Sequence, residues 1–163
     1  MGAASINVIP NWRHLYLRDS EQLGDLFEYV AVFTEDDVSE YIIKFMHSPI
    51  RKCMDEWHPR YCNDANTWLY KESIKCMGEV KKIGSKSGYA PDEARWIGEA
   101  YGRLHYITGL SSVELMKHYP LEEMRYLYPC LHEVSWTNFL TKTVKGFTYA
   151  DADKYLDPFY QEV

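Results

Sequence analysis

Apolar residues recur at spacings of three and four along most of the chain, which is the pattern of amphipathic helices. The clearest example follows Pro91, a residue that suits the first position of a helix because the missing N–H would have no partner there. The apolar stripe of this helix consists of Ile97, Ala100, Tyr101, Leu104 and Ile107. Gly109 ends the stripe, since glycine readily takes the left-handed conformation that closes a helix. The pattern predicts a helix between Pro91 and Gly109, and the rest of the chain is organised around it.

The same periodicity predicts helices on both sides of this one, each preceded by a side chain that can cap its first turn. Before it, helices are expected after Ser20, after Thr34 (with Glu35, Asp36 and Asp37 in the first turn), after Ser48-Pro49, and from Asn63 or Asp64 to about Lys82. After it, they are expected after Ser111 or Ser112, from Leu121 to Pro129, after Ser135 and around residues 151–156. The stretch Phe27 to Phe33 also fits a strand, and we prefer a helix because its neighbours are helical.

Because all strong patterns are helical, we predict an all-α fold, a single-domain bundle of about seven helices around one core. A chain of 163 residues is normally one domain. Within it we distinguish an N-terminal arm (1–18), an acidic-fronted helical half (19–83), a second helical half (89–145) and an aromatic tail (146–163). No run of 18 apolar residues that could cross a membrane occurs, and no signal-peptide pattern starts the chain, so we expect a cytoplasmic location.

The acidic excess is concentrated at the start of the chain. The formal net charge is −6, and residues 1–40 hold two basic side chains against eight acidic ones, namely Asp19, Glu21, Asp25, Glu28, Glu35, Asp36, Asp37 and Glu40. Residues 41–163 hold sixteen of each sign. We favour the interpretation that these carboxylates lie at helix starts and on a solvated face. The alternative is that they form an acidic surface, which includes Asp36 and Asp37 and docks a basic partner. Nucleic-acid binding is disfavoured because it needs a concentrated basic patch.

A second candidate surface is a row of charges on the helix after Pro91. Arg95, Glu99 and Arg103 are four residues apart, so each can pair with the next. The simpler interpretation is a solvated ion-pair ladder, and the alternative is an arginine-bearing face that grips an acidic partner. Tyr160 lies in the aromatic tail, which either packs on the core or docks onto another chain. The candidate partner-binding residues are Arg95, Glu99, Arg103, Asp36, Asp37 and Tyr160.

The four cysteines, Cys53, Cys62, Cys76 and Cys130, form no C-x-x-C pair and are expected to be reduced thiols. Cys53, His58 and Cys62 could contribute to a metal site. A fourth ligand would be Cys76 or His47. The spacing matches no standard zinc pattern, and buried free cysteine is the commoner fate, so we predict no metal.

Signatures of catalysis are weak. The sequence has no glycine-rich phosphate loop, no H-E-x-x-H and no G-x-S-x-G, so we expect no cofactor. The catalytic candidates are His105, His132, Tyr101 and Tyr128, which could meet across the helices of residues 89–138. A histidine there could act as a general base, although a histidine that only hydrogen-bonds a helix-end carbonyl is more common.

Three motifs carry a resemblance to a known group of proteins. They are E-A-x-W-x-G-x-x-Y at residues 93–101, T-G-x-S-S-x-E at residues 108–114, and P-L-E-x-M-x-x-x-Y-x-x-L-H-E at residues 120–133. With them, residues 68–140 resemble small bacterial helical proteins of unknown biochemistry, which are often encoded beside toxin-like proteins in the manner of antitoxins. The resemblance implies a protein partner rather than a substrate, and it assigns no catalytic residue. Residues 1–60 lie outside it.

The first hypothesis is therefore a non-enzymatic protein-interaction module, an antitoxin-like protein that binds and occludes a partner. The alternative is a small enzyme with a His/Tyr site in a helical cleft. A third hypothesis, nucleic-acid binding through the lysines of residues 71–86, is disfavoured by the overall acidity.

Overall fold

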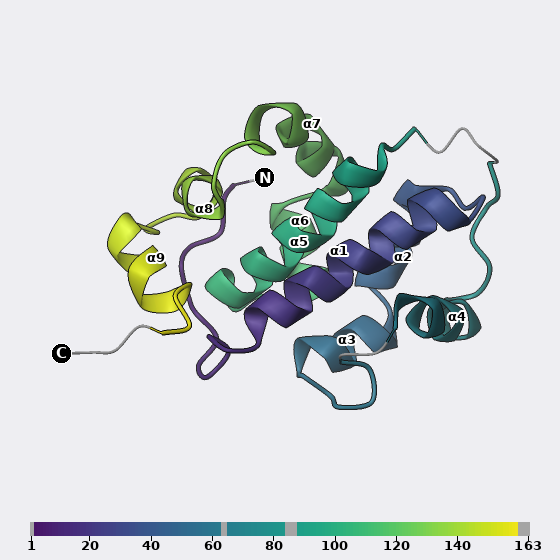
Figure 1. Ribbon diagram of the computed structural model, residues 1–163, viewed down its shortest axis with the longest axis horizontal. Helices are drawn as coiled ribbons and strands as arrows, with labels where there is room; N and C mark the ends of the chain where they lie inside the picture. Colours follow the sequence, from purple (N-terminus) through teal and green to yellow (C-terminus); the bar gives the residue numbers. More distant parts are fainter. Residues whose placement is uncertain (1, 63–64, 84–87, 160–163) are drawn as a thin grey trace.

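The computed structural model describes residues 2–62, 65–83 and 88–159, and within these ranges the protein forms nine helices and no strand (Figure 1). The helices are α1 (Tyr16–Phe33), α2 (Val38–Met46), α3 (Pro49–Asp55), α4 (Asn66–Met77), α5 (Pro91–Thr108), α6 (Ser112–His118), α7 (Leu121–Leu131), α8 (Trp136–Thr143) and α9 (Tyr149–Tyr155). The all-α prediction is confirmed. The predicted number of about seven is too low, since the described residues form nine helices, among them the short helices α3, α6 and α9 of seven residues each.

The centre of the molecule is the pair α1 and α5, which run side by side in opposite directions (Figure 1). Their backbones come unusually close because the contact is made of small residues. A Cβ atom added to Gly98 would lie 2.5 Å from the backbone carbon of Leu23, and one added to Gly102 would lie 2.6 Å from the Cα atom of Ser20. Fully buried side chains, including Leu23, Leu26, Phe27, Ile97, Tyr101 and Leu104, form the core around this contact.

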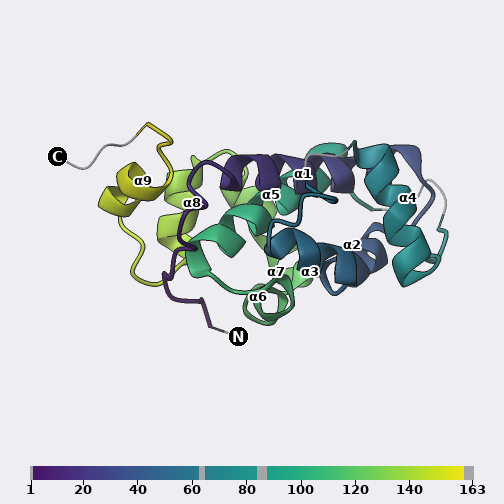
Figure 2. The same ribbon diagram turned by 90° about the horizontal axis from the view of Figure 1, so that it is seen from below.

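The other helices cover this pair. Figure 2 shows α2, α3 and α6 on one side of it, α4 at one end, and α8 and α9 at the opposite end. The N-terminal arm lies across the end of α5, where the backbone N–H of Asn7 donates to the carbonyl of Ile107 (2.8 Å) and that of Ile9 to the carbonyl of Tyr106 (3.0 Å). The arm therefore forms part of the packed body.

Several helix boundaries follow the sequence signals. Pro91 starts α5, Gly109 closes it at φ +68°, and Ser48, Ser111 and Ser135 cap α3, α6 and α8. The stretch Phe27 to Phe33 is the last part of α1, so the helical interpretation is confirmed.

Other boundaries differ from the prediction. The helix α1 begins at Tyr16 rather than after Ser20, whose hydroxyl donates to the carbonyl of Tyr16 (2.7 Å). The helix α4 ends at Met77 rather than at about Lys82, because Gly78 closes it at φ +82°.

Asp37 rather than Thr34 caps α2, because the Thr34 hydroxyl donates to the carbonyl of Val30 at the end of α1 (2.7 Å). The helix α7 continues through Pro129, since proline disrupts only the bonds of the preceding turn and this one lies near the end of the helix. Asn63 and Asp64, expected to cap α4, lie outside the described residues.

Candidate functional site

A buried polar cluster around Arg51 joins four helices. The Arg51 side chain is fully buried, and its guanidinium donates to both carboxylate oxygens of Asp19 (2.8 and 3.2 Å) and to the hydroxyl of Ser112 (2.9 Å). Asp55 lies 3.0 Å from Arg51 and accepts from the backbone N–H of Ser112 at the start of α6 (2.8 Å). Burial lowers the pKa of Arg51, but the carboxylates of Asp19 and Asp55 raise it by more. The pKa of Arg51 therefore lies above its usual value, and the group stays charged. The cluster thus connects α1, α3 and α6, and His105 connects it to α5.

His105, the first catalytic candidate, forms the edge of this cluster from α5. Its side chain is 3% exposed, and Nδ1 is 2.6 Å from the carbonyl of Leu110. Nε2 lies 3.3 Å from the carbonyl of Asp55 and 3.8 Å from its carboxylate. Trp12 covers the ring at 5.1 Å. Both ring nitrogens therefore face backbone carbonyl groups of the fold, and the ring packs against Trp12.

The other three candidates lie elsewhere. Tyr101 is fully buried and donates its hydroxyl to the carbonyl of Tyr119 (2.8 Å). His132 stacks on Tyr128 at 4.5 Å between ring centres and hydrogen-bonds the carbonyl of the same residue (2.7 Å). The structure therefore brings His132 and Tyr128 together in α7 but does not bring either of them to His105 or Tyr101.

The Arg95, Glu99 and Arg103 row differs from a solvated ladder. Arg95 forms ion pairs with Asp25 and Glu28 of α1, and its contact with Glu99 is longer, at 3.9 Å.

Arg103 is 6% exposed, lies 4.1 Å from the ring centre of Trp136, and donates to the backbone carbonyl of Glu99 rather than to its carboxylate (3.2 Å). Burial lowers the pKa of Arg103 and raises that of Glu99. The row thus links α5 to α1 and α8.

The acidic candidates also have internal roles. Asp36 is fully buried, accepts a hydrogen bond from the Tyr70 hydroxyl (2.6 Å) and pairs with Lys82. Asp37 is half-buried and accepts from the backbone N–H of Glu40 (3.3 Å). Tyr160 lies outside the described residues.

The wider acidic front is largely neutralised by basic side chains. The pairs are Asp19–Arg51, Asp25–Arg95, Glu28–Arg95, Asp36–Lys82 and Glu40–Lys44. Five of the eight carboxylates in residues 1–40 are therefore engaged within the fold. The sequence could not show this, since most of the partners are distant along the chain.

The described part of the chain contains no group of three or more His, Cys, Asp or Glu side chains that could hold a metal ion. Cys62 is buried, Cys53 is half-buried, and Cys76 and Cys130 are exposed. In the same part of the chain, none of the helices has the length and apolar character needed to cross a membrane.

An exposed aromatic and aliphatic surface lies where α1 ends beside α4. Phe33 is 74% exposed and Val32 is 47% exposed. The Phe33 ring lies 5.3 Å from that of Tyr29, which in turn lies 5.5 Å from that of Tyr70 on α4. Tyr70 lines a cavity of about 480 Å³ together with Trp68 and Ile74.

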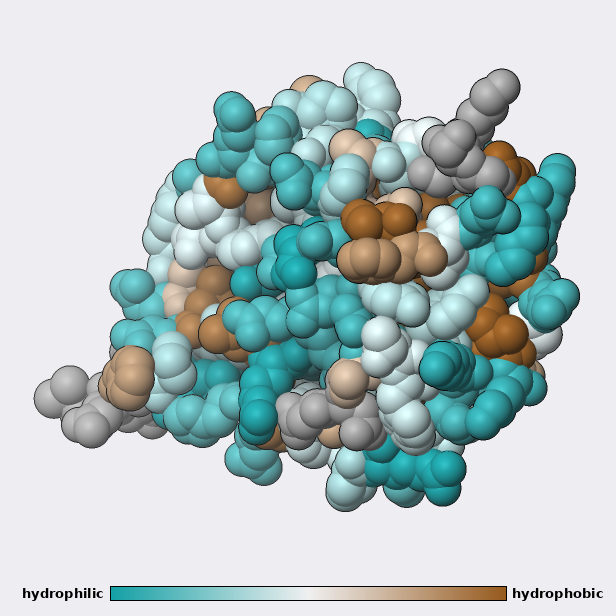
Figure 3. Space-filling model, turned by 45° about the vertical axis from the view of Figure 1, so that its right-hand side comes forward, coloured by the Kyte–Doolittle hydropathy of each residue, from teal (hydrophilic) through white to brown (hydrophobic). Residues whose placement is uncertain are grey.

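We call this surface the aromatic end, and its members are Tyr29, Val32, Phe33, Trp68, Tyr70 and Ile74. Lysines and glutamates border its cavity, namely Lys71, Lys75, Lys82, Glu72 and Glu79. Figure 3, which brings this side of the molecule forward, shows hydrophobic patches separated by hydrophilic residues. The arrangement of apolar anchors within a polar border is typical of a protein-binding surface.

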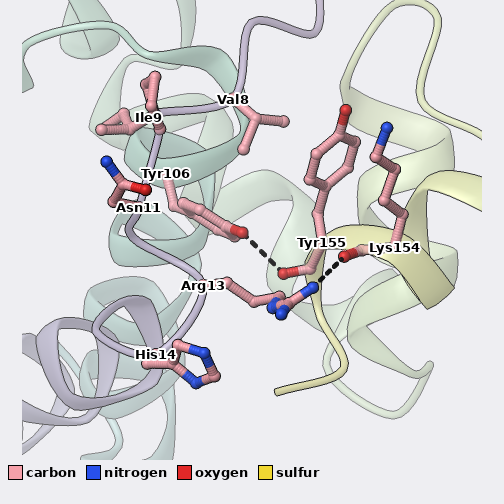
Figure 4. Close-up of a pocket in the computed structure, with 9 residues that line it drawn as sticks. Val8, Ile9, Asn11, Arg13, His14, Tyr106, Lys154 and Tyr155 are labelled. Atoms are coloured by element: carbon pink, nitrogen blue, oxygen red, sulfur yellow. Dashed lines mark hydrogen bonds between the residues drawn. The ribbon is translucent and has the colours of Figure 1, made fainter. Parts of the chain in front are cut away.

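A second cavity, of about 710 Å³, lies between the N-terminal arm, α5 and α9 (Figure 4). It is at the opposite end of the molecule from α4 (Figure 1). Sequence reasoning indicated neither cavity. The second is lined by segments far apart in the chain, whereas the first is lined by residues 68–82 and depends on how α4 and the segment after it fold.

Comparison of the chain with models of protein families, with curated proteins and with solved structures gives no match. The assignment of function therefore rests on the geometry of these surfaces.

The Arg51 cluster had one signal in the sequence. Arg51 follows Ile50 and precedes Met54 by three residues, so the helical period places it beside the inward face of α3. A charged side chain on an inward face needs a buried partner of opposite charge. The period cannot say which acid this partner is.

Proposed function

We propose that this chain is a protein-binding module and that the aromatic end is its binding face. The observation that carries the proposal is the exposure of Phe33 at the head of the aromatic row that continues through Tyr29 to Tyr70. In the free chain the apolar surface of this ring is exposed to water. A partner that covers the ring gains the free energy of burying that surface.

The cavity beside this row suggests how a partner binds. It is walled by Trp68, Tyr70 and Ile74, so it can accept an apolar side chain of the partner, while Phe33 and Val32 contact the partner's surface around that anchor. The surrounding charges include an ion pair between Lys75 and Glu72 (3.0 Å), which leaves the apolar centre as the source of affinity.

The resemblance of residues 68–140 to antitoxin-like proteins extends the proposal. On that basis the partner is a toxin-like bacterial protein encoded beside this chain in the same cytoplasm, and binding occludes it. All of α1, including Phe33, lies outside the resembling segment, whereas α4 lies almost wholly inside it.

The test is Phe33→Ser. The tagged chain is used to capture proteins from lysate of the source cell and the neighbouring gene product, with intact-complex mass spectrometry as the readout. We expect Phe33→Ser to weaken capture by about 30-fold, as expected for the loss of an aromatic hot spot worth about 2 kcal/mol. Thermal stability should be nearly unchanged, since the ring is exposed.

The matched control is Tyr126→Ser, because Tyr126 is a comparably exposed ring (79%) on α7. Capture that survives Phe33→Ser, or that Tyr126→Ser abolishes equally, contradicts the proposed face. A chain that forms no protein interface above about 800 Å² contradicts the protein-binding function itself.

A further inference from the structure

His105 lies where the Arg51 cluster meets the last turn of α5, and both nitrogens of its ring face acceptors. Nδ1 is 2.6 Å from the carbonyl oxygen of Leu110, and Nε2 is 3.3 Å from the carbonyl oxygen of Asp55. A neutral imidazole has a single N–H, so one nitrogen would turn its lone pair toward an oxygen that can only accept. An imidazolium has two N–H groups and can donate to both oxygens. The two contacts therefore favour the protonated ring.

The charges of the cluster give a second, independent reason for a proton on His105. Asp19 and Asp55 contribute two carboxylates against the single guanidinium of Arg51, and the three side chains are at most 8% exposed. Without a further proton the cluster is a buried group of net charge −1, which is costly to keep away from water. Nε2 of His105 lies 3.8 Å from a carboxylate oxygen of Asp55. Protonation of His105 therefore balances two negative charges with two positive ones.

The carboxylates themselves are poorly placed to hold this proton. Asp55 accepts hydrogen bonds from the backbone N–H of Ser112 (2.8 Å) and from its hydroxyl group (2.6 Å), and Arg51 lies 3.0 Å from the same carboxylate. Both carboxylate oxygens of Asp19 accept from the guanidinium of Arg51. A proton on either acid would turn an O–H group toward groups that donate. The thiol of Cys62 also lies near Arg51 and adds no negative charge while it holds its proton.

The place of His105 in the helix acts in the same direction. The residue lies in the last turn of α5, an 18-residue helix, where the partial negative charge of the terminal carbonyl groups favours a cation. Its side chain is 3% exposed, and the ring of Trp12 packs against it with 5.1 Å between ring centres. Water is thus largely excluded, so the acceptors of the fold determine which ring nitrogens carry a proton.

We propose that His105 is a proton-binding switch: the folded protein holds it as an imidazolium that completes the Arg51 cluster, and loss of this proton weakens the junction of α1, α3, α5 and α6. An unfolded chain releases such a proton at about pH 6.5. Because the folded state holds the proton to higher pH, the contribution of His105 to stability is complete below about pH 6.5 and falls as the folded protein releases the proton. The cluster shares no residue with the aromatic end, so neither proposal depends on the other.

Nitrogen-15 NMR of the histidine rings in the full chain tests the proposal directly. An imidazolium shows two protonated ring nitrogens, whereas a neutral ring shows one protonated and one unprotonated nitrogen. The signals of His105 are identified by nuclear Overhauser effects between its ring protons and those of Trp12. We expect both nitrogens of His105 to be protonated at about pH 7.5, where an ordinary exposed histidine is mostly neutral. A neutral His105 ring at that pH would overturn the proposal.

Two neighbouring variants test the role of the cluster charge. Asp55→Asn removes one carboxylate but keeps an oxygen that can accept from the N–H of Ser112, and it makes the cluster neutral without a proton on His105. We expect the proton affinity of His105 to fall at least about tenfold, which is about one pH unit in the NMR titration. Glu56→Gln removes the exposed carboxylate of the next residue and should leave the titration of His105 unchanged.

Chemical denaturation of the same chains at several pH values supplies a second readout. In the unsubstituted chain and in Glu56→Gln, the free energy of unfolding should decrease as the pH rises through the titration of His105. This decrease should be largely absent in Asp55→Asn. The same pH dependence in all three chains, or an unchanged titration of His105 in Asp55→Asn, contradicts the proposal. If Asp55→Asn does not fold, the NMR titration of the unsubstituted chain decides.

Discussion

At the scale of single residues, Arg51 shows how a charge can be kept in the interior. Its guanidinium is fully buried, yet it contacts two carboxylates and a hydroxyl, and the described buried side chains contain no nitrogen or oxygen without a hydrogen-bond partner. A buried ion pair adds little net stability relative to an apolar replacement of the whole group, but removal of one member leaves the others uncompensated. Replacement of Arg51 alone therefore destabilises the fold, because the buried carboxylates remain without their counter-charge.

We predict that Arg51→Met lowers the free energy of unfolding by about 3–5 kcal/mol, because Asp19 is then a buried carboxylate without its counter-charge. Chemical denaturation monitored by circular dichroism measures the change. Lys52→Met, at the exposed neighbouring position of α3, is the control and should change stability by less than about 0.5 kcal/mol. Adding Asp19→Asn to Arg51→Met should recover part of the loss. A loss below about 1 kcal/mol would show that the cluster does not hold the helices together.

At the scale of helices, the contact between α1 and α5 depends on the absence of side chains. Gly98 and Gly102 are one helical turn apart on α5 and face Leu23 and Ser20 of α1, so the two backbones touch. The close approach brings Arg95 within reach of Asp25 and Glu28 of α1. Residues that are weak helix formers by propensity thus create the central contact of the fold.

Gly98→Ala should destabilise the protein by about 1–3 kcal/mol or more, because the added methyl group meets the backbone of Leu23 and Gly24 rather than a movable side chain. Helix propensity alone would predict a gain of about 1 kcal/mol, so the sign of the effect separates the two influences. Gly2→Ala, where an added Cβ has no neighbour within 4 Å, should be neutral. Thermal melting of both variants measures the difference, and a stabilised Gly98→Ala protein would refute the close contact.

At the scale of the whole molecule, tyrosines tie the helices together through buried hydroxyl groups. The hydroxyl of Tyr41 hydrogen-bonds Ser73 (2.7 Å), that of Tyr101 reaches the carbonyl of Tyr119 (2.8 Å), and that of Tyr106 reaches Tyr155 on α9 (2.7 Å). Burial raises the pKa of all three side chains. The aromatic content is therefore mainly a property of the core, with a smaller exposed share at Phe33, Tyr126, Tyr149 and Phe159.

This arrangement predicts alkaline unfolding. Because folding raises these pKa values, the folded state retains protons that the unfolded chain releases near pH 10. The tyrosine contribution to stability is complete below about pH 10 and falls as the pH rises above it. Tyrosinate absorbance and helical circular dichroism, followed together, should show that the buried tyrosines ionise only as the helices melt.

The exposed Tyr126 provides the control for this titration. Tyr126→Phe removes an exposed hydroxyl group and should leave the midpoint of alkaline unfolding unchanged. Ionisation of Tyr41, Tyr101 and Tyr106 while the helical signal is intact would contradict the buried hydrogen bonds.

The sequence by itself determined the all-α class and many helix ends. Pro91, Gly109, Ser48, Ser111 and Ser135 act within one turn of their own position, so their effect can be read from the neighbouring residues. The helical period also assigned most of the inward faces, because burial repeats with the turn of the helix.

Only the tertiary structure decided what the charged and aromatic groups do. The same period that places Arg95 and Arg103 one above the other cannot show that Asp25 and Glu28 reach the first or that Trp136 covers the second. The aromatic end and the cavity beside the N-terminal arm each join segments that are distant in the chain. Pairing across such distances depends on how the helices pack, and many packings are compatible with one local pattern.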